Sequence, residues 1–206
     1  LDINRREKLL AFCQKTQTFI TCTDFPYNPN YTYLQIQNGK VVNTATSNIA
    51  ASEAFNISTS EQTALIKNGA PKEELRLPVF VATLPDGSQA YIFSAYGAGL
   101  WGPIWGWVSL KTDLNTISGV KFDHSGETPG LGAEITTSKV QDMFKGKTIF
   151  EGNDLVSVSM RKGGATNNHE VDAISGGTKT CDGVNAMIKS GLEGYLPFLN
   201  ANKSNK

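Results

Sequence analysis

A turn rich in glycine and hydroxyl groups precedes the last helical pattern of the chain. It lies between Asp172 and Thr180, and its adjacent glycines, Gly176 and Gly177, permit positive φ and a close approach of the backbone to a bulky group. Three hydroxyl-bearing residues share this turn, namely Ser175, Thr178 and Thr180. Apolar residues then recur at helical spacing, so the turn opens a helix whose first amides lack intrahelical partners and lie at the positive end of the helix dipole. Such an opening suits a phosphate, and the same residues also suit an ordinary N-cap.

A second glycine-rich segment runs from Glu127 to Gly132, directly after a predicted strand. Its glycines, Gly130 and Gly132, allow backbone N–H groups to approach a ligand closely. The side chains of Glu127 and Thr128 offer polar contacts to the edge of a flat ring, and a flavin ring presents carbonyl and N–H groups that such a loop can bind. From the residues alone, a covering loop without a ligand stays an alternative.

Two further segments have two interpretations each. Residues 97–110 interleave glycines with tryptophans, which fits either a core strand with bulges or an aromatic wall that includes Trp101 beside a flat ligand. The segment from Arg161 to Gly164 places a basic pair before two glycines. It suits either the neutralisation of a phosphate, through Lys162, or a solvated turn.

Three of these segments together resemble the signatures of the FMN-binding domain family. The order Asp-x-x-Ser-Gly-x-Thr, from Asp172 to Thr178, looks like that family's flavinylation motif. Residues 127–134 look like its second signature, and residues 99–107 are similar to its Gly-Leu-Trp region. Alanine is usual in the family where Gly177 stands, and glycine keeps the turn possible. The resemblance covers the second half of the chain strongly and the first half weakly.

The resemblance implies that a flavin transferase esterifies the phosphate of FMN to Thr178. The flavin would then relay electrons between partners, without catalytic residues or a metal supplied by the chain itself. The predicted cofactor-contacting residues are Thr178 (the phosphoester), Asp172, Ser175, Gly176, Gly177, Thr180, Glu127, Thr128, Pro129, Gly130, Leu131, Gly132, Trp101, Gly102 and Lys162.

The resemblance also implies a cellular context. The partners would be the other subunits of a sodium-pumping NADH:quinone oxidoreductase in the bacterial cytoplasmic membrane, with this domain on the outer, periplasmic side. A transmembrane helix upstream of Leu1 would tether it. The alternatives are the corresponding subunit of the related Rnf electron-transport complex and an exported binding domain without a redox role.

The elements that must position these segments mix strands and helices without regular βαβ alternation, and no G-x-G-x-x-G follows a strand. We therefore predict an α+β fold with a twisted, largely antiparallel sheet and flanking helices, divided into an N-terminal helix and hairpin region (1–75) and an FMN-binding domain (76–206). Strands are predicted at 31–37, 41–46, 78–84, 89–96, 116–122 and 154–160, and helices at 1–15, after the capping box 58–61 and within 133–145, with an irregular loop at 22–30.

Composition excludes several classes of function. The 19 Lys and Arg residues balance the 19 Asp and Glu residues, so nothing indicates nucleic acid or an anionic surface as a partner. Apolar runs fall far short of the ~20 residues that a membrane-spanning helix needs. The three cysteines have no metal-binding spacing, and whether Cys13 and Cys22 pair stays open. The two histidines, His124 and His169, are distant in sequence, which argues against a metal site.

Overall fold

The computed structural model describes residues 31–45, 53–84 and 86–203. The helix predicted at 1–15, the loop predicted at 22–30 and the question of a Cys13–Cys22 pair lie outside these residues. In chain order the elements are β1 (Tyr31–Gln37), β2 (Lys40–Ala45), α2 (Glu53–Asn56), α3 (Thr59–Lys67), the 3₁₀ helix η3 (Lys72–Glu74), β3 (Leu77–Thr83), β4 (Gln89–Ala98), β5 (Pro103–Leu110), β6 (Ile117–His124), the 3₁₀ helix η4 (Gly132–Thr136), α4 (Ser138–Asp142), β7 (Phe150–Glu151), β8 (Asp154–Leu155), β9 (Ser159–Arg161), β10 (Glu170–Asp172), α5 (Thr178–Gly194) and α6 (Leu196–Asn202).

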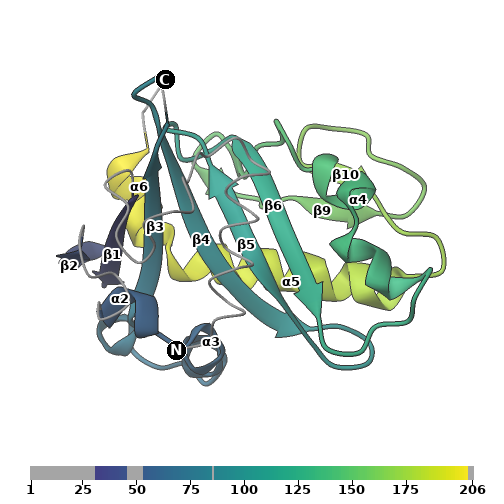
Figure 1. Ribbon diagram of the computed structural model, residues 1–206, viewed down its shortest axis with the longest axis horizontal. Helices are drawn as coiled ribbons and strands as arrows, with labels where there is room; N and C mark the ends of the chain where they lie inside the picture. The colour runs from purple at the N-terminus through teal and green to yellow at the C-terminus, as the bar shows by residue number, and fades with distance from the viewer. Residues whose placement is uncertain (1–30, 46–52, 85, 204–206) are drawn as a thin grey trace, which may run out of the picture.

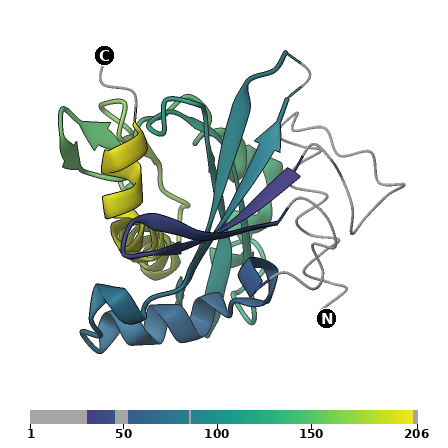
Figure 2. The same ribbon diagram turned by 90° about the vertical axis from the view of Figure 1, so that its left-hand side faces the viewer.

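Six strands form one sheet in the order β2-β1-β3-β4-β5-β6, and every neighbouring pair is antiparallel. Hairpins connect most neighbours directly, whereas the chain passes through α2 and α3 between β2 and β3. Helix α5 lies across one face of the twisted sheet, and α3 lies near the β1 edge (Figure 1 and Figure 2). The predicted α+β class with an antiparallel sheet and flanking helices is confirmed.

The sheet continues across residue 75, where the sequence predicted a boundary between two parts of the chain. The β1–β2 hairpin belongs to the first part, and β1 pairs with β3 of the second part from Tyr31↔Ala82 to Ile36↔Leu77. The first part therefore supplies the edge of a sheet that both parts share. The division into two parts stays a prediction.

Local sequence signals set several turns as expected. Asn38 and Gly39 both have positive φ, at 47° and 73°, as the two-residue turn of a hairpin requires. Ser58 is the N-cap of α3, and its side chain accepts a hydrogen bond from the Glu61 amide. Helix α3 ends at Lys67, and Asn68 is its C-cap, directly before Gly69. The hairpin around Asn38–Gly39 and the capping box are confirmed.

The interpretation of residues 97–110 as one bulged strand is wrong. The segment instead closes the β4–β5 hairpin: β4 ends at Ala98, β5 begins at Pro103, and the Gly99 amide donates to the Gly102 carbonyl at 2.8 Å across the turn. The pattern misled because glycines that permit this turn look, in sequence, like bulges within a continuous strand.

Two other elements are also shorter than predicted. The strand predicted at 154–160 is split into β8 and β9, because Ser157 has a φ of 64° and the Val156 and Ser157 amides both donate to the Ile149 carbonyl at 2.9 Å. The helix predicted within 133–145 is divided into η4 and α4 by Thr137, whose extended backbone makes it the N-cap of α4.

Helix α5 approaches β4 as closely as its glycines allow. A Cβ at Gly183 would lie 2.3 Å from the carbonyl oxygen of Ala98, and a Cβ at Gly97 would lie 2.8 Å from the Cβ of Met187. The apolar stripe of the helix faces the core through Val184, Met187, Ile188 and Leu192, all buried. This close packing fixes where the first turn of α5 lies at the end of the sheet.

We expect the substitution Gly183→Ala to destabilise the protein by roughly 1–3 kcal/mol, because its methyl group would collide with the backbone of β4. The higher helix propensity of alanine, worth about 1 kcal/mol, offsets only part of this strain. Urea unfolding gives the change in the free energy of unfolding. The matched control is Gly126→Ala, whose Cβ would meet only the Trp101 carbonyl, at 3.7 Å. Equal stability of the two variants would contradict the tight contact.

Candidate functional site

Three loops meet at one end of the sheet, beside the start of α5 (Figure 1). They are the β4–β5 turn, the loop that follows β6 and the turn before α5. The carboxylate of Glu127 joins all three: its Oε1 accepts a hydrogen bond from the Trp101 amide at 2.9 Å, and its Oε2 accepts one from the Thr180 hydroxyl. Glu127 is only 4% exposed and Thr180 only 1%, so both bonds are shielded from water.

The Glu127 carboxylate leaves no room for side chains at two neighbouring positions. A Cβ at Gly132 would lie 2.4 Å from both Glu127 Oε2 and Thr180 Oγ1, and a Cβ at Gly99 would lie 2.4 Å from Glu127 Oε1. Gly132 was expected to let the backbone approach a ligand. In the structure it makes room for a buried contact within the protein.

The loop from Thr128 to Leu131 is a tight turn that points outward. The Leu131 amide donates to the Thr128 carbonyl at 3.1 Å, with Pro129 second and Gly130, at a φ of 75°, third, as in a type II turn. Thr128, Pro129 and Gly130 lie in this turn, where Pro129 and Gly130 are exposed. The Leu131 side chain reaches the motif turn, since a Cβ at Gly176 would lie 2.7 Å from Leu131 Cδ2.

The motif turn uses its first glycine as the sequence suggested. Gly176 has a φ of 74°, and the Gly177 amide donates to the Ile174 carbonyl at 3.0 Å. The Ile174 amide in turn donates to Cys181 Sγ at 3.4 Å. Burial raises the pKa of the Cys181 thiol, so this cysteine stays protonated and supports the turn.

Helix α5 begins at Thr178 with Gly177 as its N-cap, and no side chain caps it. The amides of Thr178, Lys179 and Thr180 find no acceptor in the described part of the chain. The Thr178 side chain is exposed, and the first turn contains no acidic residue. Lys179, which the sequence reasoning overlooked although it lies inside the motif, adds an exposed positive charge. This end of α5 therefore suits a bound phosphate.

Exposed apolar side chains surround the same end of the sheet. Leu100 is 52% exposed, Trp101 66% and Leu131 41%. Trp107, by contrast, is buried in β5, so the tryptophans of this region divide between core and surface. Leu100 was not among the predicted residues, although it belongs to the same Gly-Leu-Trp segment. Apolar side chains gathered on a surface mark a site for a ligand or partner.

Known proteins share this arrangement. A family model described as the FMN-binding domain matches residues 99–193, which contain all three loops. The chain is 36% identical over 156 residues to the NqrC subunit of the Na(+)-translocating NADH-quinone reductase of Neisseria meningitidis serogroup B, a match over 74% of this chain and 59% of that relative. The crystal structure of the corresponding reductase subunit from Parabacteroides distasonis matches over 100% of both chains, with a TM-score of 0.71 and 32% identity. The chain belongs to the NqrC family of Na(+)-translocating NADH-quinone reductase subunits.

A second solved structure of the NqrC family, from Shewanella oneidensis, matches with a TM-score of 0.74 and 25% identity, over 96% of this chain and 99% of that one. The resemblance to the FMN-binding domain family is confirmed, and the NqrC family is favoured over the corresponding subunit of the Rnf complex. The match spans about half the length of the curated relatives, from 41% of the Pasteurella multocida protein to 59% of the Neisseria meningitidis protein.

Two of the predicted residues lie beside the three loops in this member of the NqrC family. Asp172 Oδ1 accepts a hydrogen bond from the Ala165 amide at 2.8 Å and so orders the loop between β9 and β10. Lys162 is exposed in that loop, and its ammonium group has no partner among the described residues. Asn185 of α5 holds β9 through the amide and carbonyl of Met160. A contact between Lys162 and a phosphate stays a prediction.

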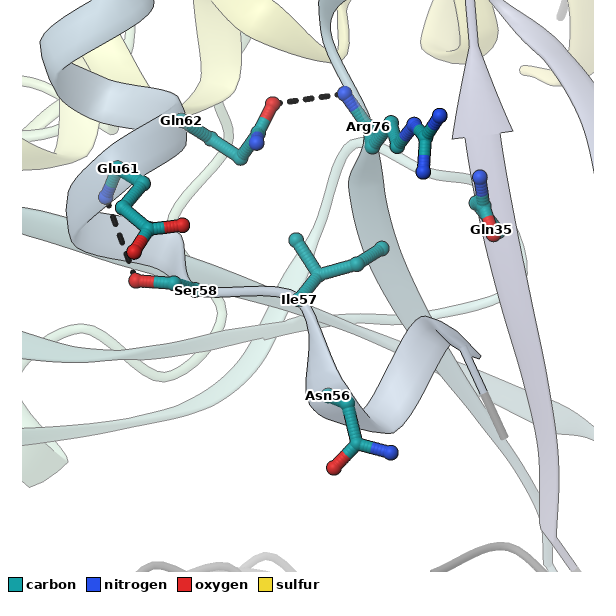
Figure 3. Close-up of a pocket in the computed structure, with 7 residues that line it drawn as sticks. All are labelled: Gln35, Asn56, Ile57, Ser58, Glu61, Gln62 and Arg76. Carbon is teal, nitrogen blue, oxygen red and sulfur yellow. Dashed lines mark hydrogen bonds between the residues drawn. The ribbon is translucent and has the colours of Figure 1, made fainter. Parts of the chain in front are cut away.

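A pocket of about 400 Å³ lies elsewhere, between β1, α3 and the start of β3 (Figure 3). In it the Glu61 amide donates to the Ser58 hydroxyl, and the Arg76 amide donates to Gln62 Oε1 at 2.7 Å. Its lining residues are Gln35, Asn56, Ile57, Ser58, Glu61, Gln62 and Arg76. None of these residues belongs to the three loops, so the pocket is separate from the family's signature segments.

Over the described ranges, no helix is both long and apolar enough to cross a membrane. Within the same ranges, no group of three or more histidine, cysteine or acidic side chains gathers around a point that could hold a metal ion.

The loop that carries Lys162 depends on an ionised carboxylate. Hydrogen bonds from the Thr166 amide, the Arg161 guanidinium and the Thr166 hydroxyl lower the pKa of Glu170 from 4.5 to about 2. Because the folded-state pKa is the lower one, the stabilisation is complete above pH 4.5 and is lost as the pH falls from there through 2.

We therefore expect an NMR titration of the Glu170 carboxyl to give a midpoint near 2. Exchange of the Thr166 amide should stay slow until the pH falls toward that value. The control is Glu170→Gln, in which the Thr166 amide should lose the protection that depends on an ionised carboxylate. A midpoint near 4.5 would mean that these bonds do not persist in solution.

Proposed function

We propose that this chain carries FMN covalently, through a phosphoester to Thr178, and relays electrons as part of a sodium-pumping NADH-quinone reductase. The observation that carries the proposal is the exposed Thr178 hydroxyl in the first turn of α5, beside amides without acceptors among the described residues and beside exposed apolar side chains. Membership of the NqrC family and the FMN-binding domain match support the choice of FMN.

The residues at the start of α5 fit a phosphate. The amides of Thr178, Lys179 and Thr180 would donate hydrogen bonds to it, and the helix dipole and the Lys179 ammonium would balance its charge. Ser175 lies in the preceding turn and offers a further hydroxyl. Thr180 is an unsuitable attachment point, because its hydroxyl is buried and bonded to Glu127.

The exposed apolar side chains fit a flat aromatic ring. Trp101 offers an aromatic face for stacking, and Leu100 and Leu131 offer aliphatic surface beside it. Pro129 and Gly130 present exposed backbone near Leu131, where the ring's polar edge would find partners. Asp172, Gly102 and Lys162 remain proposed contacts, whereas the Glu127 carboxylate already serves as an internal acceptor.

Bound FMN would supply electron transfer in one-electron or two-electron steps. The protein's own residues would hold the phosphate, orient the ring and leave one side of it open to redox partners. We propose that these partners are the other subunits of the complex, and that a membrane-spanning helix upstream of Leu1 tethers the domain on the periplasmic side of the cytoplasmic membrane.

Attachment needs a flavin transferase and an activated flavin donor, which we propose to be a flavin dinucleotide. The Thr178 oxygen would form a bond to the phosphorus next to the flavin, and the diphosphate bond would break. The nucleoside monophosphate leaves, and the hydroxyl proton passes to a base of the transferase. No electrons are transferred in this step.

We expect the purified protein, incubated with a flavin transferase and flavin dinucleotide, to gain the mass of FMN less one water. Peptide mapping should place this mass on Thr178. Thr178→Val keeps the shape but lacks the oxygen nucleophile, so labelling should disappear; Thr178→Ser, the matched control, should be labelled. Labelled Thr180 beside an unmodified Thr178 would refute the assignment, and an unlabelled wild-type protein would refute covalent attachment.

We expect Trp101→Ala to change the visible circular dichroism and the fluorescence of the attached flavin, because the stacking face is lost. The Thr178 label itself should persist. Val42→Ala is the control, since Val42 is 51% exposed on the edge strand β2, away from the three loops. If the two loaded variants have spectra identical to wild type, Trp101 does not contact the ring.

A further inference from the structure

Thr178 and Thr180 occupy the same turn of α5 but have opposite surroundings. At about 100° per residue, side chains two positions apart point to nearly opposite sides of a helix. Thr178 accordingly faces solvent, whereas Thr180 faces inward and is 1% exposed. The inward side chain therefore fixes the rotation of this turn, and that rotation determines where the outward hydroxyl points.

Glu127 is the acceptor that holds Thr180. The bond runs between residues 53 positions apart and joins the loop after β6 to α5. Hydrogen bonds to an ionised carboxylate are roughly twice as strong as those between neutral groups, and burial strengthens them further. A carboxylate near the start of a helix is also stabilised by the helix dipole.

The second oxygen of Glu127 holds the opposite side of the site. It accepts the Trp101 amide at 2.9 Å, so one side chain fixes both the turn that carries the exposed tryptophan and the helix turn that carries Thr178. Gly99 and Gly132 lie against the same carboxylate and give it space. Without this side chain, the two turns would lose the hydrogen-bonded group that they share.

We propose that Glu127 is a positioning residue for flavin attachment: through Thr180 it orients the Thr178 hydroxyl, and through the Trp101 amide it sets the distance from that hydroxyl to the exposed aromatic ring. It touches neither the reacting oxygen nor the phosphorus. This inference rests on the proposed covalent attachment at Thr178.

The test compares rates of flavin transfer to Thr178 from flavin dinucleotide by a purified transferase, followed by mass. Glu127→Leu keeps the volume but accepts no hydrogen bond, and Thr180→Val replaces the donor with a methyl group. Each should slow transfer about tenfold or more, as expected for the loss of a buried hydrogen bond to a charged group. Glu127→Gln can still accept from Trp101 and donate to Thr180, so it should stay within about threefold of wild type.

Because both residues act through one contact, the Glu127→Leu/Thr180→Val double variant should be no slower than the slower single variant. The matched control is Glu134→Leu, at an acidic residue of the same signature segment whose carboxylate has no partner among the described residues. It should label at the wild-type rate. In the unlabelled proteins, exchange of the Trp101 amide should accelerate in Glu127→Leu and not in Glu134→Leu.

Wild-type transfer rates in folded Glu127→Leu or in Thr180→Val would overturn the inference, and so would single effects that multiply in the double variant. If Glu127→Leu does not fold, Thr180→Val and Glu127→Gln decide the question, since each changes only a few atoms. Failure of the proposed function is recognised separately, because the wild-type protein itself would then remain unlabelled.

Discussion

The close contact of helix α5 with strand β4 is the constraint on which the rest of the structure depends. Gly183 lies against the Ala98 carbonyl and Gly97 lies against Met187, at distances that exclude any side chain at either glycine. A helix held this closely cannot shift along the strand without collision, and tightly packed interiors resist such displacement. The start of α5 is therefore fixed at the end of the sheet where the β4–β5 turn and the loop after β6 also lie.

This placement creates a problem that Glu127 solves. A helix start and two turns brought together leave backbone amides and a hydroxyl with reduced access to water, and each buried donor needs an acceptor. A carboxylate supplies two oxygens at one position, and Glu127 uses them for Trp101 and Thr180. The amides at the outermost end of α5 have no acceptor within the described ranges, so the same arrangement that satisfies the interior leaves a place for an anion at the surface.

The sequence predicted best what depends on near neighbours. The Asn38–Gly39 turn, the cap at Ser58 and the turn before Thr178 are set by a few adjacent residues, and each was correctly located. Contacts between distant segments were missed: Glu127 was assigned a ligand contact, and nothing in its neighbourhood indicated a bond to Thr180, 53 residues on. The break at Ser157 was missed because non-glycine residues rarely adopt positive φ. The glycines of residues 97–110 misled because those of a turn and those beneath a helix look alike in sequence.

The openness of the site explains why a covalent bond would be useful there. Ligands held without covalent bonds are usually enclosed by most of their surface in a concave pocket. Here Pro129, Gly130 and Thr178 are all exposed, and Trp101 is 66% exposed, so a ring against them would remain largely open on its outer side. That openness suits electron exchange with a large partner but offers few contacts to retain a freely dissociating cofactor. A phosphoester at the start of α5 removes dissociation while leaving the ring, at the far end of the flavin's ribityl chain, free to face its partners. Exposure and covalent attachment are thus two consequences of the same requirement for contact with another protein.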